Sequence, residues 1–407
     1  MLSILANRTY RHLFLAQLIA VIGTGLATIA LSLLAYDLAG EEAGLVLGLA
    51  LTIKMVCYVT IAPIAAAFAA QMPRRTWLVT LDLIRAGAAL CLPFVTEIWQ
   101  IYLLIFVLQS ASAAFTPAYQ ASIPDVLPDE EEYTKALSLS RLAYDLESLV
   151  SPGLAALLLG VLTFDSLFFG TAIGFVASAL LVTSILLPSP VPTVRRSLHD
   201  RTTRGLRLYL TTPRLRGLLG LTVAASATAS MVFVNTVVMT RSVLGLGESS
   251  VALALALFGV GSMLVALILP PLLKHTKERR VMSLGALVAI LSLTGLAVVQ
   301  GGGSLTMGWV GLAWFGTGVG YAAVMTPSGR LLRRSVAPED GPAIFAAQFT
   351  LSHACWLVSY PLAGWAMTRL GAQPTLLLLT GLAWIGLLVG RWAWPAPKPD
   401  QTQPETN

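Results

Sequence analysis

Ionisable side chains inside apolar stretches carry the most specific chemical information in this chain. Arg141, Asp145 and Glu147 lie in a stretch expected to be a helix over 133–162, and Lys54 lies in another such stretch. At about 1.5 Å per residue, Asp145 and Glu147 come roughly 18–21 Å into their helix, past the middle of a bilayer. A carboxyl group there either binds a proton or keeps a cationic partner, because burial disfavours its charge. These residues therefore predict a site for protons or cations.

The spacing gives the two carboxylates different roles. Arg141 and Asp145 are four residues apart and share a helix face, so Asp145 is either a structural ion-pair partner or part of the proton site. Glu147 points to roughly the opposite side and has no partner within its own helix. We expect Glu147 to be the main proton or cation site, with Lys54 as its counter-ion from another helix.

A histidine and several other polar groups are candidates for a cavity or a proton relay. His353 lies near mid-depth of an expected helix over 341–368, where Tyr144 lies in the first half of the chain. Imidazole titrates near neutrality and binds soft divalent metals, but a packed neutral histidine is the structural alternative. Cys355 is two residues further and points elsewhere, which argues against a His-Cys metal clamp. Helix-to-helix hydrogen bonding explains the amides in apolar stretches equally well; these are Gln17, Gln109, Asn235 and Gln348.

Composition identifies the class of protein. The 407 residues are 56% apolar and 11% charged, with a mean hydropathy of +0.78, whereas about a quarter of a soluble globule is charged. The chain is therefore an integral membrane protein. Cys57, Cys91 and Cys355 lack the paired spacing of a zinc site, and we expect buried free thiols and no metal site. The basic residues cluster beside helix ends, which argues against nucleic acid as a partner.

The expected elements are apolar helices. Runs of about 20 apolar residues predict twelve of them, near 11–36, 43–70, 76–96, 98–122, 133–162, 165–187, 214–240, 248–272, 281–300, 304–329, 341–368 and 373–394. With the amino terminus inside, only Arg241 and Arg369 fall outside, whereas the other basic residues between helices fall inside. This bias predicts that both termini are cytoplasmic.

The second half of the chain repeats a pattern of prolines that is found in the first half. Thr116-Pro117 is followed eleven residues later by Pro128, and Thr326-Pro327 is followed at the same distance by Pro338. A six-helix unit used twice is typical of transporters that rock two halves around a site between them. We predict a bundle over 1–187, a cytoplasmic linker over 188–213, a second bundle over 214–394 and a disordered tail over 395–407. The linker arginines are expected on anionic lipid headgroups, and a regulatory or nucleic-acid-binding loop is the alternative.

Several strings resemble the major facilitator superfamily, in particular its bacterial branch of macrolide-efflux and nickel-resistance exporters. They are Asn7-Arg8-Thr9-Tyr10-Arg11, Pro73-Arg74-Arg75, Asp82-Leu83-Ile84-Arg85 and the segment 117–125, while 137–147 is closest to the nickel-resistance group. The resemblance implies an all-α membrane fold of two pseudo-symmetric six-helix bundles. No histidine follows Pro395, which lowers the expectation of metal cargo.

The resemblance also implies a cytoplasmic gate in the loop between the second and third helices. Family members normally carry a glycine and an Asp-Arg pair there, but this chain has Ala66 and Ala70-Gln71. Arg74 and Arg75 remain of the family's usual charged residues, and we expect the gate to be either weakened or rebuilt from Asp82 and Arg85.

Together these features predict a secondary active transporter. No P-loop motif occurs, so the expected energy source is an ion gradient, and the few mid-depth carboxylates favour protons. We expect a monomer in the bacterial inner membrane, without cofactor, that exports a drug-like or amphiphilic compound or a divalent metal such as nickel by proton antiport. The alternatives are a proton symporter for a nutrient or siderophore and a non-transporting receptor or scaffold. No nucleophile-base arrangement recurs, so an enzyme is not expected.

Overall fold

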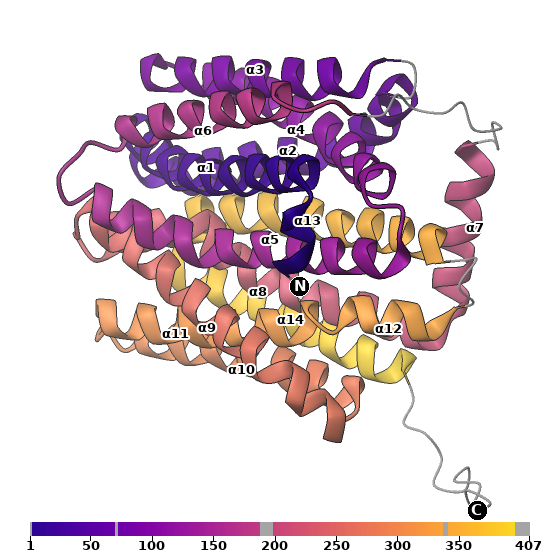
Figure 1. Ribbon diagram of the computed structural model, residues 1–407. Coiled ribbons are helices and arrows are strands. Elements are labelled where there is room, and N and C mark those ends of the chain that lie inside the picture. The colour runs from indigo at the N-terminus through magenta and orange to yellow at the C-terminus, as the bar shows by residue number, and fades with distance from the viewer. Residues whose placement is uncertain (1, 70–71, 188–197, 337–340, 395–407) are drawn as a thin grey trace, which may run out of the picture.

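The computed structural model describes residues 2–69, 72–187, 198–336 and 341–394, and every long element in this part of the chain is a helix. The first half contains α1 (Arg8–Ala39), α2 (Ala43–Ala69), α3 (Arg74–Cys91), α4 (Ile98–Val126), α5 (Glu130–Leu158) and α6 (Asp165–Thr183). The second half contains α8 (Pro213–Val237), α9 (Glu248–His275), α10 (Glu278–Gly301), α11 (Met307–Met325), α12 (Ser328–Ser335), α13 (Gly341–Leu370) and α14 (Ala372–Ala393). Helix α7 (Leu198–Thr211) joins them along one end of the molecule (Figure 1).

Short-range chemistry explains where several helices begin and end. The side chain of Asn7 accepts a hydrogen bond from the backbone of Tyr10 at the start of α1, and Asp129 does the same for Glu132 at the start of α5. These contacts satisfy amide groups that have no partner inside the helix. Helix α1 stops at Gly40, with φ of 54°, and α13 stops before Gly371, with φ of 84°. Both values lie in the left-handed region that glycine adopts readily.

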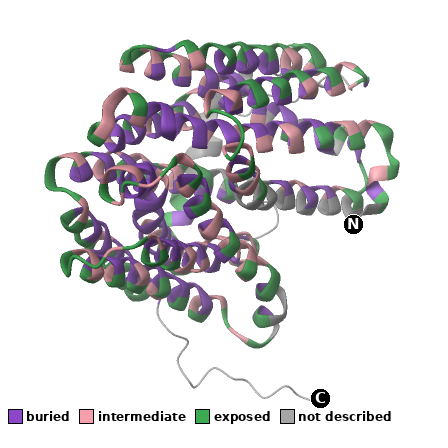
Figure 2. Cartoon of the chain, turned by 90° about the vertical axis from the view of Figure 1, so that its left-hand side faces the viewer, coloured by how far each residue is buried: buried purple, intermediate pink, exposed green. Residues whose placement is uncertain are grey.

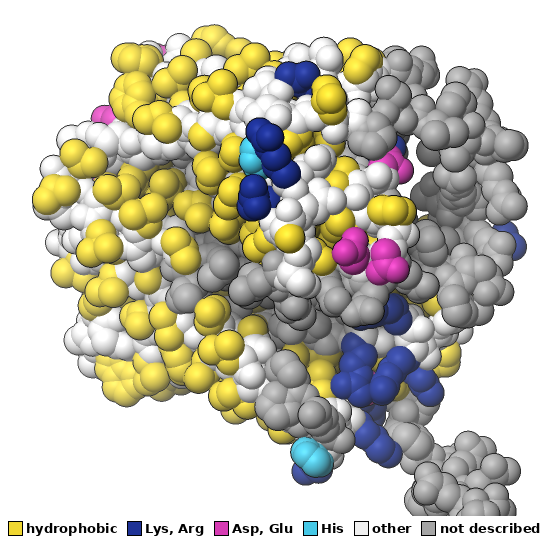
Figure 3. All heavy atoms as spheres, viewed as in Figure 1, with side chains coloured by type: hydrophobic (Ala, Val, Ile, Leu, Met, Phe, Trp, Pro, Cys, Tyr) yellow, Lys and Arg dark blue, Asp and Glu magenta, His cyan; other side chains and the backbone are white. Residues whose placement is uncertain are grey.

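The helices are long and apolar enough to cross a bilayer. Eight helical stretches in the described part meet that criterion, and the first of them, Arg8–Ile61, runs through both α1 and α2. Figure 2 shows exposed residues along the outer faces of the helices and buried residues between them. In Figure 3 apolar side chains cover much of the visible face, and the visible Lys and Arg lie from the middle of the view to the right, the side on which α7 is found. The chain is therefore a multi-pass membrane protein, whereas the count of twelve spans stays a prediction.

Most predicted boundaries agree with the helices to within a few residues. Part of the predicted linker forms helix α7, which was not anticipated from the sequence. Two expectations need correction. The helix expected over 304–329 is interrupted, because α11 ends at Met325 and α12 begins at Ser328, on either side of Pro327. Cys91 is exposed rather than buried, and only Cys57 of the three free thiols is fully buried.

The buried apolar core is shared at one end and divided at the other. A large cluster at the end opposite α7 contains Leu34 and Leu47 of the first half together with Val234 and Met367 of the second. At the α7 end, one cluster is built from the first half alone and another from the second half, with Tyr209 of α7. Among the side chains that the structure describes, hydrophobic contact therefore joins the halves mainly at the end opposite α7.

Candidate functional site

A small cavity in the first half contains two of the predicted polar residues. Its volume is about 20 Å³, enough for a water molecule. Lys54 of α2 and Gln109 of α4 line it together with Thr24 and Thr28 of α1. Both threonine hydroxyls donate to carbonyl oxygens one turn earlier, Thr24 to Ala20 and Thr28 to Thr24, each at 2.9 Å. Their oxygens can therefore only accept further hydrogen bonds, whereas Lys54 can only donate.

Lys54 lies where the first half meets the second. It is close enough to His353 of α13 for the two side chains to interact electrostatically. The His353 ring stacks on Tyr58, one turn along α2 from Lys54, with ring centroids 5.5 Å apart and planes 8° apart. Nδ1 of His353 lies 2.7 Å from the carbonyl oxygen of Phe349, so this nitrogen carries the proton and donates it. The structure thus brings Lys54 and His353 together, and sequence reasoning missed Tyr58, Thr24 and Thr28.

Glycines allow α2 and α13 to lie side by side beyond this point. A side chain added at Gly48 would come within 2.8 Å of the carbonyl oxygen of Tyr360, and one at Gly364 within 2.3 Å of the carbonyl oxygen of Gly44. Gly44 faces Met367, whereas Tyr58 faces Phe349 and His353, so the two helices run antiparallel. Gly44 and Gly48 therefore permit the close approach of α2 to α13.

The other predicted amides connect helices. Gln17 accepts a hydrogen bond from Ser140 at 3.1 Å. Asn235 is fully buried and donates to the carbonyl oxygen of Ala363 at 3.1 Å. Gln348 accepts a hydrogen bond from the hydroxyl of Tyr209 in α7. These three contacts fit the structural alternative of hydrogen bonding between helices, and among these amides Gln109 is the one that lines the cavity.

Four predicted residues belong to α5, but their side chains lie outside the described residues. They are Arg141, Tyr144, Asp145 and Glu147. Helix α5 itself contacts α1 within its own half and α9 of the other half. It therefore runs along the boundary between the halves, and the roles of the four side chains stay predictions.

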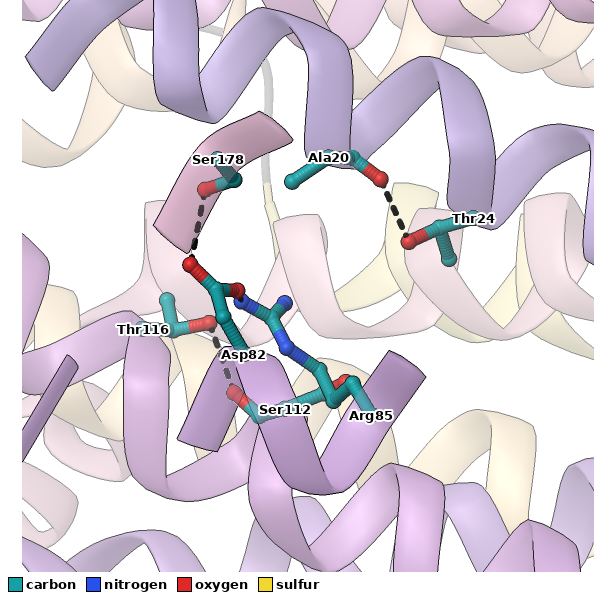
Figure 4. Close-up of polar contacts among 7 residues, drawn as sticks. All are labelled: Ala20, Thr24, Asp82, Arg85, Ser112, Thr116 and Ser178. Carbon is teal, nitrogen blue, oxygen red and sulfur yellow. Dashed lines mark hydrogen bonds and ion pairs between the residues drawn. The ribbon is translucent and has the colours of Figure 1, made fainter. Parts of the chain in front are cut away.

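Asp82 and Arg85 form a charged group inside the first half (Figure 4). They form an ion pair within α3, and Asp82 also accepts a hydrogen bond from Ser178 of α6 at 2.7 Å. The guanidinium of Arg85 lies over the ring of Phe115, at 4.1 Å from its centroid, and over that of Phe175, at 4.6 Å. Asp82 is 0% exposed and Arg85 5%. Both charges are therefore enclosed by helices of the first half.

The other two predicted gate residues also contact their own half. Arg74 forms an ion pair with Asp125 at the end of α4, and Arg75 donates to the carbonyl oxygen of Thr183 at the end of α6. These contacts tie α3 to its neighbours at the α7 end. The structure therefore splits the four residues into two groups, and their role as a gate stays a prediction. Sequence reasoning quoted Asp125 in the segment 117–125 without giving it a role at the gate, and it missed Ser178.

The described residues offer no metal site. No group of three or more His, Cys, Asp or Glu side chains in the described part of the chain is placed to hold a metal ion. Sγ of Cys355 contacts the carbonyl oxygen of Leu351 at 3.3 Å, whereas His353 stacks on Tyr58. These two side chains therefore take different partners.

Comparison with known proteins agrees with this architecture. The profile of the Major Facilitator Superfamily matches residues 13–323. The MFS-type transporter YfiS of Bacillus subtilis (strain 168), described as uncharacterized, is 23% identical over 302 residues, which cover 71% of this chain and 70% of that protein. Macrolide efflux protein A of Streptococcus pyogenes is 26% identical over 149 residues, which cover 35% of this chain and 36% of that protein.

The fold is also similar to solved transporter structures. A bacterial homologue of the human lysosomal transporter Spinster, in an inward-facing and unoccupied conformation, superimposes with a TM-score of 0.74 at 12% identity. The alignment covers 95% of this chain and 96% of that one. Because the family profile extends over more than half of its length, the chain belongs to the Major Facilitator Superfamily of membrane transporters.

Proposed function

We propose that the protein exports a small toxic solute across the bacterial inner membrane in exchange for protons. The observation that carries this proposal is the position of Lys54. It lines a mid-depth cavity with Gln109 and interacts with His353 of the opposite half. An ionisable group at this depth is costly to bury, so it is expected to serve transport.

The proton site of this proposal lies on α5. Glu147 is the proton-binding group, Asp145 shares the task or pairs with Arg141, and Lys54 is the counter-ion. The position of α5 between α1 and α9 supports this assignment, because a proton site must sense the rearrangement of the two halves. In each transport cycle, Glu147 would release its proton on the side where cargo is bound.

The direction of transport is inferred from two observations. Partial similarity to macrolide efflux protein A supports export of an organic compound. The basic residues beside helix ends support cytoplasmic termini, so that the α7 end faces the cytoplasm. Separate apolar cores at that end support a state in which the halves part on the cytoplasmic side and cargo enters from there.

Everted membrane vesicles test this function. Acidification of the lumen should drive accumulation of labelled erythromycin or ethidium in vesicles that contain the wild-type protein, and a protonophore should abolish it. Glu147→Gln should lose this response, while Glu132→Gln, a change at an exposed residue near the start of the same helix, should retain it.

Three outcomes contradict the proposal or part of it. Full proton-driven exchange by Glu147→Gln would remove that residue from the mechanism. Accumulation that requires an alkaline lumen would indicate a symporter. Unchanged resistance after neutralisation of Glu147, Asp145 and Lys54 together would indicate a receptor or scaffold. Replacement of the organic compounds by Ni²⁺ in the same assay decides between the two classes of cargo.

A further inference from the structure

A cluster of five aromatic rings lies inside the second half. It is built from Phe233 of α8, Phe258 of α9, Tyr321 of α11, and Trp356 and Tyr360 of α13. Phe233 contacts Phe258 edge-on at 5.1 Å between centroids and contacts Trp356 at 6.0 Å. Tyr321 contacts Phe258 at 5.7 Å and Trp356 at 6.2 Å, and Trp356 contacts Tyr360 at 4.8 Å. Four helices thus contribute to one continuous aromatic surface, which we call the aromatic wall.

The aromatic wall and the polar cavity lie at the same depth. Counted from the helix ends opposite α7, Phe258, Tyr321 and Trp356 lie roughly 15–21 Å along their helices. By the same count, Thr28, Lys54 and Gln109 lie roughly 17 Å along theirs. The aromatic wall and the polar cavity therefore lie at the same depth near the middle of the bundle, one in each half.

The antiparallel pair of α2 and α13 places the two sides next to each other. Tyr58 is level with Phe349 and His353, and Gly48 is level with Tyr360. Lys54 lies between Tyr58 and Gly48 on α2, and Trp356 lies between His353 and Tyr360 on α13. Lys54 is therefore level with Trp356 across the boundary.

The rings of the wall differ in exposure. Phe258, Trp356 and Tyr360 are each less than 9% exposed, whereas Phe233 and Tyr321 are half-buried. Helix α8 is largely enclosed by other helices, with 83% of its apolar segment buried, and Phe233 packs against the large apolar cluster. Trp314 belongs to the same apolar cluster; it is fully buried and donates from Nε1 to Thr236 at 2.6 Å. The wall thus has two half-buried rings and three buried ones.

We propose that the aromatic wall determines cargo specificity and that the cargo is an organic amphiphile with aromatic rings. Its rings stack against Phe233 and Tyr321, and its polar end is directed toward Gln109. This inference rests on the proposed transport function and narrows its cargo. Aromatic faces attract rings by stacking and organic cations by their quadrupole, but they offer no ligands for a divalent metal and few hydrogen bonds for a sugar-like nutrient.

A pair of cations matched in charge and general shape provides the test. Tetraphenylphosphonium carries four aromatic rings, and tetrabutylphosphonium carries four alkyl chains. Binding to purified full-length protein is measured by equilibrium dialysis in detergent, with protein-free micelles as the blank. The wild type should favour tetraphenylphosphonium by roughly three- to tenfold, the range expected for aromatic contacts.

Variants assign this preference to the wall. Phe233→Leu should reduce the preference to about one, and Phe233→Tyr should retain it, because an aromatic ring is kept. The matched control is Phe169→Leu, at an exposed phenylalanine of α6 that contacts Phe94 on the outer surface. A wild type that shows no preference or binds neither cation would overturn the inference, and so would a Phe233→Leu variant that keeps the wild-type preference.

The result is independent of proton coupling, because no gradient is present in the dialysis cell. Loss of pH-driven uptake in vesicles with an intact binding preference would reject the proton-antiport mechanism and leave the aromatic wall in place. Proton-driven export together with equal binding of the two cations would reject the role of the aromatic wall and leave the proton-antiport mechanism in place.

Discussion

Tyr58 of α2 and His353 of α13 stack almost parallel across the boundary between the halves, with ring centroids 5.5 Å apart. The imidazole is also held by its own helix, through the hydrogen bond from Nδ1 to the carbonyl oxygen of Phe349. The two rings, one from each half, therefore meet at the level where the described apolar core is no longer shared between the halves. This contact must change whenever the two halves rock against each other.

Removal of this stack should shift the balance between the conformations of the transporter. An aromatic pair contributes about 0.5–1.5 kcal/mol beyond its buried area, so Tyr58→Leu should change the ratio of states by roughly three- to tenfold. Distances between spin labels at the α7 ends of the two halves report that ratio. Phe94→Leu disrupts the Phe94–Phe169 contact within the first half and should leave the distribution unchanged. An identical distribution in Tyr58→Leu would contradict the prediction.

The Asp82–Arg85 pair should matter for stability more than an exposed pair does. Asp82→Asn leaves the Arg85 guanidinium buried without its carboxylate, and the expected loss is about 3–5 kcal/mol in the free energy of unfolding. Arg334 also forms an ion pair, with Glu278, but its side chain is 59% exposed, so Arg334→Gln should cost less than about 1 kcal/mol. Thermal unfolding in detergent measures both variants. A drop in melting temperature that is no larger for Asp82→Asn than for Arg334→Gln would contradict this prediction, because the buried ion pair would then contribute no more to stability than the exposed one.

The close approach of α2 and α13 should tolerate no added methyl group. In Gly364→Ala the new Cβ would lie 2.3 Å from the carbonyl oxygen of Gly44, a backbone atom that can move only with its helix. We expect this variant to separate the two helices and to lose most of its transport activity. Gly381→Ala in α14 is the control, because nothing lies within 4 Å of the added Cβ. Transport in both variants is compared at equal amounts of folded protein, and equal activity would refute the steric argument.

The docking of α7 should weaken in alkaline solution. Burial, and to a smaller extent the charge of Cys355, raises the pKa of Tyr209 above its ordinary value of 10.0. The protonated phenol, which donates to Gln348, is therefore favoured in the docked state. Its contribution is complete below pH 10 and declines as the pH rises above 10, because the undocked phenol then loses its proton.

Limited proteolysis within α7 measures this effect. Cleavage of the wild type should accelerate above about pH 10, relative to Tyr209→Phe, whose side chain does not titrate. Tyr209→Phe should also be cleaved faster than the wild type at pH 7, because it lacks the hydrogen bond to Gln348. Equal pH profiles for the two proteins would contradict the assignment.

Local sequence patterns were sufficient to predict the helices and their approximate ends. A bilayer requires long apolar runs, and caps such as Asn7 and Asp129 act within a few residues of their own position. The break at Pro327 and the helical form of α7 were missed. Pro117, the counterpart of Pro327 in the repeat, lies within a continuous α4, so proline alone does not determine whether a helix stops. Tertiary packing decides between these outcomes.

The amino-acid sequence determined that this is a membrane protein of repeated design, and it identified Lys54 and Gln109 as polar groups inside apolar stretches. Hydropathy and charge are sums over neighbouring residues, so they can be read along the chain. Only the tertiary structure placed Lys54 level with Trp356, stacked Tyr58 on His353 and enclosed Asp82 and Arg85 within one half. Those relationships join residues far apart in the sequence, and they depend on the packing and relative register of whole helices, which no local pattern encodes.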